Sequence, residues 1–240
     1  SGDEIVGQLY NFVDKGERQV ALRPEMTPSL ARILGERSRS LPKPIRWFTM
    51  PQLFRYERQQ RGRLREHFQW NVDIVGEEGV GADAEVVAVA IDALRELGLG
   101  SDDFRARVSD RRLLTAILEA LGVRHDAVGA AFGLIDKVER MPAEAARQKL
   151  RDEAGLDEAA CTRLLALLGR TDVEALAAEF AAHAGVLEAL QPLRGYVAAL
   201  EAMGLGGYVD VDLTIVRGLA YYTGIVFELF DRKGELRAIC

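Results

Sequence analysis

The chain has 240 residues, of which 48% are hydrophobic, and it carries a formal net charge of −6. This is the composition of an ordinary globular protein that can bury at least one full core, with room for two lobes. No stretch approaches the roughly 20 apolar residues of a membrane helix, and the N-terminus has no signal-peptide pattern, so we expect a cytoplasmic protein without membrane contacts. The negative charge argues against a surface devoted to non-specific nucleic-acid binding.

The cysteines and histidines do not predict a metal site. Cys161 and Cys240 lie far apart in a chain too large to need a disulfide scaffold, so we expect both to be reduced thiols. The histidines have neither metal-ligand spacing nor a neighbouring cysteine cluster; they are His67, His125 and His183.

The first part of the chain predicts short strands and one helix. Residues 8–14 and 19–22 alternate in polarity around a turn at 15–17, which predicts a β-hairpin. Thr27 is a candidate N-cap with Pro28 at the first helical position, and the helix should end near Arg37. Further extended segments are expected at 45–50, 52–56 and 68–75.

A long helical region then interrupts the strands. A helix is expected at 82–97 and a strand at 104–109, after which apolar residues recur at helical spacing. Strand-like patterns return at 208–214, 221–230 and 235–240. The order predicts an α+β fold, with an antiparallel sheet flanked by helices and an inserted all-helical module. We expect a core at 1–111 and 201–240, and an insertion at 112–200.

The segment Leu22-Arg23-Pro24-Glu25-Met26-Thr27 is the first candidate site. It puts a carboxylate and a hydroxyl at a strand-to-helix junction, where Glu25 could hold a substrate ammonium group. The alternative is structural: Glu25 pairs with Arg23, and Thr27 caps the helix.

The second candidate is a pair of strands around an arginine-rich turn, Phe54-Arg55-Tyr56-Glu57-Arg58 and Arg65-Glu66-His67-Phe68-Gln69-Trp70-Asn71-Val72-Asp73. The planar guanidinium suits phosphate, and Arg55 within a strand would be held rigidly. For the loop arginines, a solvated and salt-bridged hairpin tip is the alternative. Gln69, Asn71 and Asp73 would share one strand face and could line a pocket floor.

The third candidate is Val216-Arg217-Gly218-Leu219-Ala220-Tyr221-Tyr222-Thr223-Gly224, which joins a cation, a glycine turn and two tyrosines before a strand. If the segment is extended, Tyr221 and Tyr222 point to opposite faces, so that one packs and the other presents its hydroxyl.

These three segments, in this order and separated by helices, resemble the histidyl-tRNA synthetase family over nearly the whole chain. The resemblance implies a class II synthetase-like fold. It implies a histidine site of Glu25, Thr27, Gln69, Asp73, Tyr221 and Tyr222, with Glu25 and Gln69 near the α-ammonium and Asp73 and Tyr222 at the imidazole. It implies catalytic roles for Arg55 and Arg217, and an ATP site of Arg55, Glu57, Arg63 and Arg217.

The implied reaction is attack of the histidine carboxylate on the α-phosphorus of ATP, with Mg²⁺, followed by transfer of the histidyl group to tRNA(His). The resemblance also implies a homodimer. Ala220 stands where many members of the family carry Asp, so this chain departs from the family pattern at one supporting contact and keeps Arg217, Tyr221 and Tyr222.

The chain begins after the expected motif 1 helix and stops before the motif 3 arginine and any anticodon-binding domain, so we expect an excerpt of a longer protein that is not fully active. Two alternatives remain open. One is a histidine-sensing regulatory subunit of ATP phosphoribosyltransferase, and the presence of Arg55 and Arg217 argues against it. The other is an RNA-sensing pseudo-synthetase domain attached to a kinase.

Overall fold

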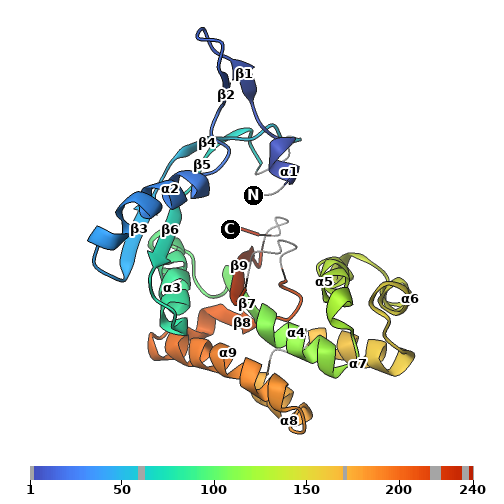
Figure 1. Ribbon diagram of the computed structural model, residues 1–240. Coiled ribbons are helices and arrows are strands. Elements are labelled where there is room, and N and C mark those ends of the chain that lie inside the picture. Colours follow the sequence, from blue (N-terminus) through green and yellow to red (C-terminus); the bar gives the residue numbers. More distant parts are fainter. Residues whose placement is uncertain (1–2, 59–62, 170–171, 217–222, 234–237, 240) are drawn as a thin grey trace. The chain divides into compact units, whose positions relative to one another are not determined.

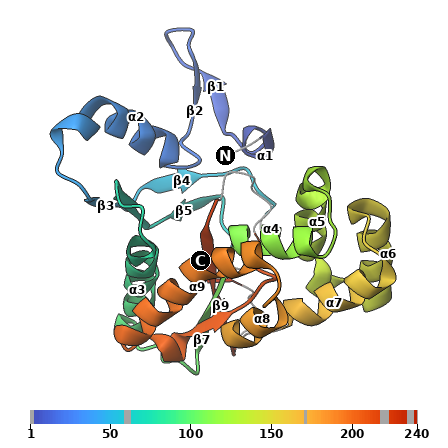
Figure 2. The same cartoon turned by 60° about the horizontal axis from the view of Figure 1, so that its bottom comes forward.

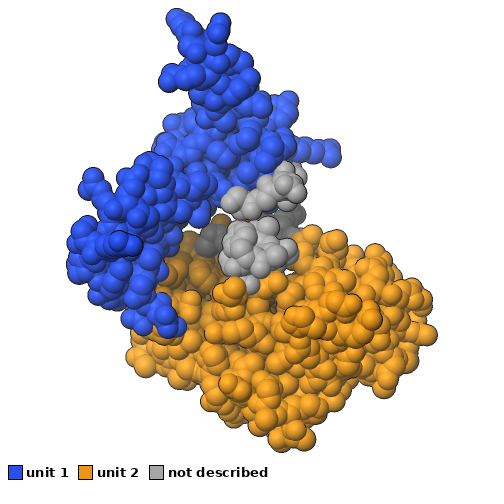
Figure 3. All heavy atoms as spheres, viewed as in Figure 1, with its two compact units in different colours: residues 1–78 blue, residues 79–240 orange. Residues whose placement is uncertain are grey.

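The computed structural model describes residues 3–58, 63–169, 172–216, 223–233 and 238–239 (Figure 1). The chain divides into two compact units, which Figure 3 colours separately. Unit 1 is Ser1–Glu78 and unit 2 is Gly79–Cys240.

Unit 1 consists of short strands paired two by two, with one longer helix. Every strand pair in it is antiparallel: β1 with β2, β3 with β6, and β4 with β5. Its elements are α1 (Asp3–Val6), β1 (Asn11–Val13), β2 (Gln19–Ala21), α2 (Thr27–Arg37), η1 (Ser38–Ser40), β3 (Ile45–Thr49), β4 (Gln52–Phe54), β5 (Glu66–Phe68) and β6 (Asn71–Val75).

The predicted hairpin is confirmed, with Phe12 opposite Val20. Its turn is held by the Asp14 carboxylate, which accepts hydrogen bonds from the backbone N–H groups of Gly16 (2.8 Å) and Arg18 (3.0 Å). An Asx side chain that bonds the backbone ahead of it is a common way to close such a turn. Local sequence therefore determines this element.

Helix α2 ends at Arg37 as predicted, but the N-cap expected at Thr27 is wrong by one residue. Met26 occupies the N-cap position and makes no side-chain cap hydrogen bond. Proline is tolerated within the first helical turn because its missing N–H would have no helical partner there. The helix therefore begins at Thr27, one residue before Pro28.

The single strand expected at 68–75 is two strands. β5 ends at Phe68 and pairs with β4, whereas β6 begins at Asn71 and pairs with β3. Between them, the Gln69 N–H donates to the carbonyl of Pro51 at 3.2 Å. Asn71 and Asp73 share a face of β6 as predicted, but Gln69 lies outside that strand.

Unit 2 is built on a three-stranded sheet in the order β8-β7-β9. Figures 1 and 2 show the long helices α3 and α9 beside this sheet and the α5–α7 helices beyond α4. The elements are α3 (Val80–Glu96), β7 (Phe104–Asp110), α4 (Arg111–Ala120), η2 (His125–Ala127), α5 (Val128–Ile135), η3 (Val138–Arg140), α6 (Ala143–Ala154), α7 (Glu158–Leu168), α8 (Val173–Glu179), α9 (Ala184–Ala202), η4 (Gly206–Tyr208), β8 (Val209–Val211) and β9 (Ile225–Asp231).

The sheet of unit 2 is mixed. β9 pairs with β7 antiparallel, as predicted, but β8 pairs with β7 in parallel. Parallel neighbours need a long crossover connection, and here the helices from α4 to α9 provide it. No local signal in residues 208–214 gives the direction of that strand.

A continuous apolar core joins the sheet of unit 2 to its helices. The inward side chains of β7, Phe104, Ala106 and Val108, are fully buried and belong to the same cluster as residues of α3, α4 and α9. Cys161 of α7 is a buried free thiol, and burial raises its pKa. Cys240 lies outside the described residues.

The Tyr196 hydroxyl supports a stability prediction. Tyr196 in α9 is fully buried, its pKa is raised by burial, and its hydroxyl has no hydrogen-bond partner within the described part of the chain. Removing an unpaired buried hydroxyl should leave the free energy of unfolding unchanged, or raise it by up to about 1 kcal/mol, in Tyr196→Phe. Tyr196→Ala should lower it by about 3–5 kcal/mol. Urea denaturation measures both; a clear loss in the phenylalanine variant would mean that the hydroxyl is bonded.

Candidate functional site

The first two candidate segments meet in unit 1. The N–H of Phe54 donates to the carbonyl of Arg23 at 2.9 Å, and Nε of Arg55 donates to the carbonyl of Pro24 at 2.9 Å. Glu25, the next residue, is half-buried. The structure thus holds the Arg55 side chain against the segment that carries the candidate ammonium ligand.

Arg55 is fixed by its backbone as well as by its side chain. The prediction that Arg55 lies within a strand is wrong by one residue, because β4 ends at Phe54. Arg55 directly follows β4, is half-buried, and its N–H donates to the carbonyl of Arg65 at 2.9 Å. Its terminal nitrogens have no hydrogen-bond partner among the residues that the structure describes. A guanidinium oriented through Nε presents its two outer nitrogens as a fork, the geometry that pairs with carboxylate or phosphate oxygens.

The other arginines of the hairpin have different surroundings. Nε of Arg65 donates to the carbonyl of Glu57 at 2.9 Å, and its guanidinium lies 4.0 Å from the centre of the Tyr56 ring. Arg63 forms an ion pair of 3.3 Å with Glu57, and its side chain is 68% exposed. Arg65 therefore stabilises the hairpin. Arg63 and Glu57, both predicted at the ATP site, are paired with each other.

A polar face lies on the β3–β6 pair. Thr49 is directly opposite Asn71, and Trp47 is opposite Asp73, so these four residues share one side of the ribbon. The buried Thr49 Oγ1 and Asn71 Oδ1 have no hydrogen-bond partner within the described residues. Burial raises the pKa of Asp73. Buried polar atoms normally have partners, and a bound ligand can supply them.

Of the predicted histidine ligands in unit 1, Thr27 and Gln69 are exposed, whereas Glu25 and Asp73 are half-buried. Thr27 opens α2 and Gln69 lies in the bend between β5 and β6. A joint histidine site for these four residues stays a prediction.

The third candidate segment falls largely on residues that the structure does not describe. Arg217, Tyr221 and Tyr222 lie outside the described ranges. Val216, which precedes them, is buried, and Gly224 follows closely before β9. That Arg55 and Arg217 face the same nucleotide stays a prediction.

Sequence reasoning missed two polar groupings. Thr49 gave no signal, because only strand register brings it opposite Asn71. Asp110, Arg111 and Arg112 lie where β7 meets α4, and Asp110 is fully buried. Three consecutive charged residues at a strand end were the available signal, since a buried carboxylate requires a partner.

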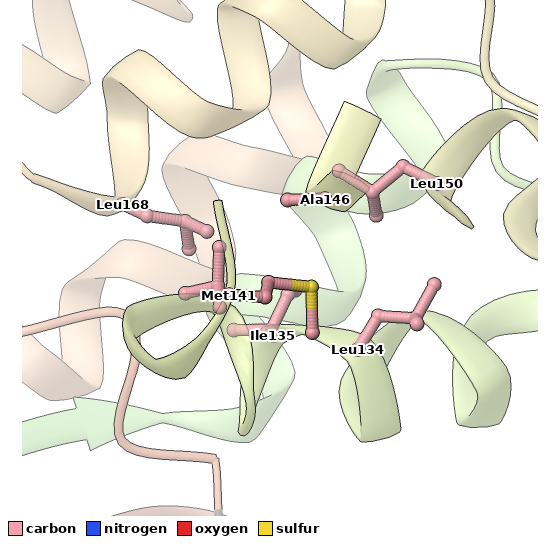
Figure 4. A pocket seen from close by; sticks show the side chains of 7 residues that line it. Leu134, Ile135, Met141, Ala146, Leu150 and Leu168 are labelled. Atoms are coloured by element: carbon pink, nitrogen blue, oxygen red, sulfur yellow. The ribbon is translucent and has the colours of Figure 1, made fainter. Parts of the chain in front are cut away.

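The described residues hold no metal-ligating cluster. No group of three or more His, Cys, Asp or Glu side chains in this part of the chain could bind a metal ion. A cavity of about 10 Å³ in unit 2 has an apolar lining (Figure 4), which includes Leu134, Ile135, Met141, Ala146, Leu150 and Leu168. It has room for about one water molecule, whereas ligand sites measure hundreds of Å³. None of the described helices has the length and apolar character needed to cross a membrane.

Comparison with known proteins identifies similar chains. The sequence model of the histidyl-tRNA synthetase family matches residues 1–238. The histidine–tRNA ligase of Opitutus terrae is 44% identical over 100% of this chain and 55% of its own length. The chloroplastic/mitochondrial histidine–tRNA ligase of Arabidopsis thaliana is 42% identical over 100% of this chain and 49% of its own. The chain therefore spans about half the length of these curated relatives.

A solved structure from Bacillus halodurans, described as an ATP phosphoribosyltransferase regulatory subunit/histidyl-tRNA synthetase, has a TM-score of 0.78 at 24% identity. It covers 96% of this chain and 59% of that protein. At this identity the likeness concerns the fold, and the predicted α+β, class II synthetase-like fold is confirmed.

The raised pKa of Asp73 predicts a pH-dependent effect on stability. Because the pKa of Asp73 in the folded state lies above the ordinary value of 3.8, the folded protein binds this proton more tightly than the unfolded chain does. The resulting contribution to stability is complete below pH 3.8 and is lost as the pH rises through the raised pKa. Asp73→Asn removes a half-buried charge and should raise the free energy of unfolding at pH 7, with a gain that shrinks as the pH falls toward 3.8. Urea denaturation at pH 7, 5.5 and 4.5 measures this, and exposed Asp126→Asn controls for the loss of one charge. A variant less stable than wild type at pH 7 would instead show that the carboxylate is stabilised by a partner.

Proposed function

The chain belongs to the histidyl-tRNA synthetase family, and we propose that the natural protein carrying it activates histidine with ATP and transfers it to tRNA(His). The geometric observation that carries the proposal is the hydrogen bond from Nε of Arg55 to the carbonyl of Pro24. This bond holds the Arg55 guanidinium, which can bind a phosphate or a carboxylate, against the segment that contains Glu25. The Glu25 carboxylate can bind an ammonium group. Histidine and ATP together present these three charges.

We assign the amino-acid site from these positions. The half-buried Glu25 carboxylate pairs with the α-ammonium, assisted by Gln69, and Thr27 lines the same site. The half-buried Asp73 accepts a hydrogen bond from the imidazole. Tyr221 and Tyr222 complete the imidazole pocket, one by packing and one through its hydroxyl.

The nucleotide site uses the arginines. Arg55 binds an oxygen of the α-phosphate together with the substrate carboxylate, which its fork geometry allows. Arg63 and Glu57 belong to the ATP side, where the exposed Arg63 guanidinium can turn from Glu57 to a phosphate. Arg217 provides the second fixed cation.

In the first step, a carboxylate oxygen of histidine attacks the α-phosphorus in line, and the bond to the bridging oxygen breaks as pyrophosphate leaves with the electron pair. In the second, a terminal ribose hydroxyl of tRNA attacks the carbonyl carbon and releases its proton to solvent, and the bond between the carbonyl carbon and the phosphate oxygen breaks as AMP leaves with the electron pair. Arg55 and Arg217 stabilise negative charge on the phosphoryl oxygens and need not exchange a proton. Positioning and electrostatics therefore account for most of the acceleration.

Further parts of the proposal concern partners and organisation. Mg²⁺ enters with ATP on the phosphate oxygens, since it usually needs only one or two protein carboxylates. The core comprises 1–111 and 201–240, the helical module 112–200 is an insertion, and the protein is a cytoplasmic homodimer. A regulatory subunit that senses histidine would share the fold and the histidine pocket. The relatives named as ligases at 42% and 44% identity favour the charging enzyme.

Histidine-dependent ATP–pyrophosphate exchange by the complete natural protein tests the proposal. Arg55→Ala and Arg217→Ala should each lower the exchange rate at least about 100-fold, because each removes a cation that stabilises transition-state charge. Arg32→Ala is the matched control, since Arg32 is an exposed arginine of α2 paired only weakly with Glu36 at 3.4 Å. Histidine binding without exchange by the folded wild-type protein would favour the regulatory subunit.

A further inference from the structure

One arginine of unit 2 bonds to both flanks of the third candidate segment. The backbone N–H of Arg111 donates to the carbonyl of Gly224 at 3.1 Å, and Nη1 of Arg111 donates to the carbonyl of Val216 at 2.7 Å. These two carbonyls bracket residues 217–223. A residue more than a hundred positions earlier in the sequence thus fixes the entrance and the exit of that stretch.

The hydrogen bond at the entrance acts on a specific peptide group. The carbonyl of Val216 belongs to the planar peptide whose nitrogen is that of Arg217. Val216 is 1% exposed, so its carbonyl lies where a missing partner is costly. The hydrogen bond therefore fixes the last peptide carbonyl before residue 217.

Arg111 is itself held rigidly. Its guanidinium lies 4.3 Å from the centre of the Phe132 ring in α5, and burial lowers its pKa. It remains charged at physiological pH, because an arginine pKa lies far above that range. The backbone of Arg111 is fixed by its position directly after the central strand β7.

Neighbouring contacts fix the same flanks. Asp110 is fully buried, accepts hydrogen bonds from the backbone N–H and from the guanidinium of Arg112, and so sets the start of α4. On the entrance side, the Asp212 carboxylate accepts from the N–H (2.9 Å) and the hydroxyl (2.6 Å) of Thr214. Arg107 pairs with Asp212 in turn. Arg111 bonds to both flanks, through its backbone N–H and through its side chain.

We propose that Arg111 is a positioning residue for histidine activation, which fixes the segment carrying Arg217, Tyr221 and Tyr222 at both ends. The inference rests on the proposed function for its catalytic consequence, whereas the anchoring itself rests on the two hydrogen bonds. Arg111 acts through the segment and does not touch the substrate. A displacement of about 1 Å at a catalytic group can cost about 100-fold in rate.

The test compares Arg111→Met, Arg111→Lys and the control Arg105→Met in the complete natural protein. Methionine keeps an apolar stem over Phe132 but cannot donate to Val216, whereas lysine keeps a donor. Arg105 lies on β7, the strand that directly precedes Arg111, and its side chain pairs with Asp210 at 3.7 Å, away from the bracketed segment.

In pyrophosphate exchange, Arg111→Met should lower kcat about 10- to 100-fold and raise the KM for histidine, with the KM for ATP within about threefold of wild type. Arg111→Lys should recover part of the loss, and Arg105→Met should match wild type. Equal losses in the two methionine variants, or a kcat unchanged in Arg111→Met, would overturn the catalytic role.

Amide hydrogen exchange gives a readout that does not depend on activity. In Arg111→Met, a peptide covering 213–225 should exchange at least about threefold faster than in wild type, while peptides of α9 stay unchanged. If wild type lacks pyrophosphate exchange, the proposed function fails and this comparison still decides the anchoring. Unchanged hydrogen exchange in 213–225 would overturn the anchoring.

Discussion

Strand β7 is the constraint on which unit 2 depends. It is the central strand of its sheet, hydrogen-bonded to β8 on one edge and β9 on the other, and its inward side chains are fully buried. It ends at Asp110, whose carboxylate is fully buried and pairs with Arg112. A buried carboxylate without a partner would be costly, so this pair fixes the conformation of the strand end. The same strand end thereby fixes the first turn of α4, the position of Arg111 and both flanks of the third candidate segment. The end of β7 therefore affects both the packing of this sheet and the proposed chemistry.

Unit 1 is stabilised differently. Among its described residues, the buried hydrophobic side chains are Leu30, Ile45 and Leu53, a small core for about 75 residues. Its remaining order comes largely from backbone hydrogen bonds between distant segments and from the Arg55 side chain on Pro24. Replacing Arg55 consequently removes a structural contact as well as a ligand group. Any activity lost in that variant has to be compared with its stability before it is assigned to chemistry.

Local signals determined what could be predicted. The hairpin at Asp14 and the end of α2 at Arg37 depend on nearby residues, and the sequence alone was enough for both. The break at Gln69 could not be predicted, because the alternation of polar and apolar side chains continues through it. β5 ends at Phe68 because its pairing with β4 stops there, and that pairing involves residues distant in sequence. The parallel direction of β8 depends on where the helical crossover returns the chain, which local residues do not encode.

The same distinction applies to the candidate site. Residue type and strand position singled out Arg55, but only the fold reveals that Pro24 orients it. Strand register brings Thr49 opposite Asn71, and the role of Arg111 follows from its hydrogen bond to the Val216 carbonyl. In all three cases, the residue that lies against the side chain is distant along the chain, so local sequence could not predict the contact.

Arg55 and Arg111 use guanidinium geometry in related ways. In Arg55, Nε holds a backbone carbonyl, and the two outer nitrogens retain a fixed plane toward whatever they bind. In Arg111, an outer nitrogen holds the carbonyl, and the guanidinium carbon lies over the Phe132 ring. A lysine has one nitrogen at the end of a flexible stem, so it can hold a carbonyl or neutralise a phosphate but cannot use one contact to orient the other. Replacing either arginine by lysine therefore preserves charge and loses direction, and direction is what a reaction dominated by positioning requires.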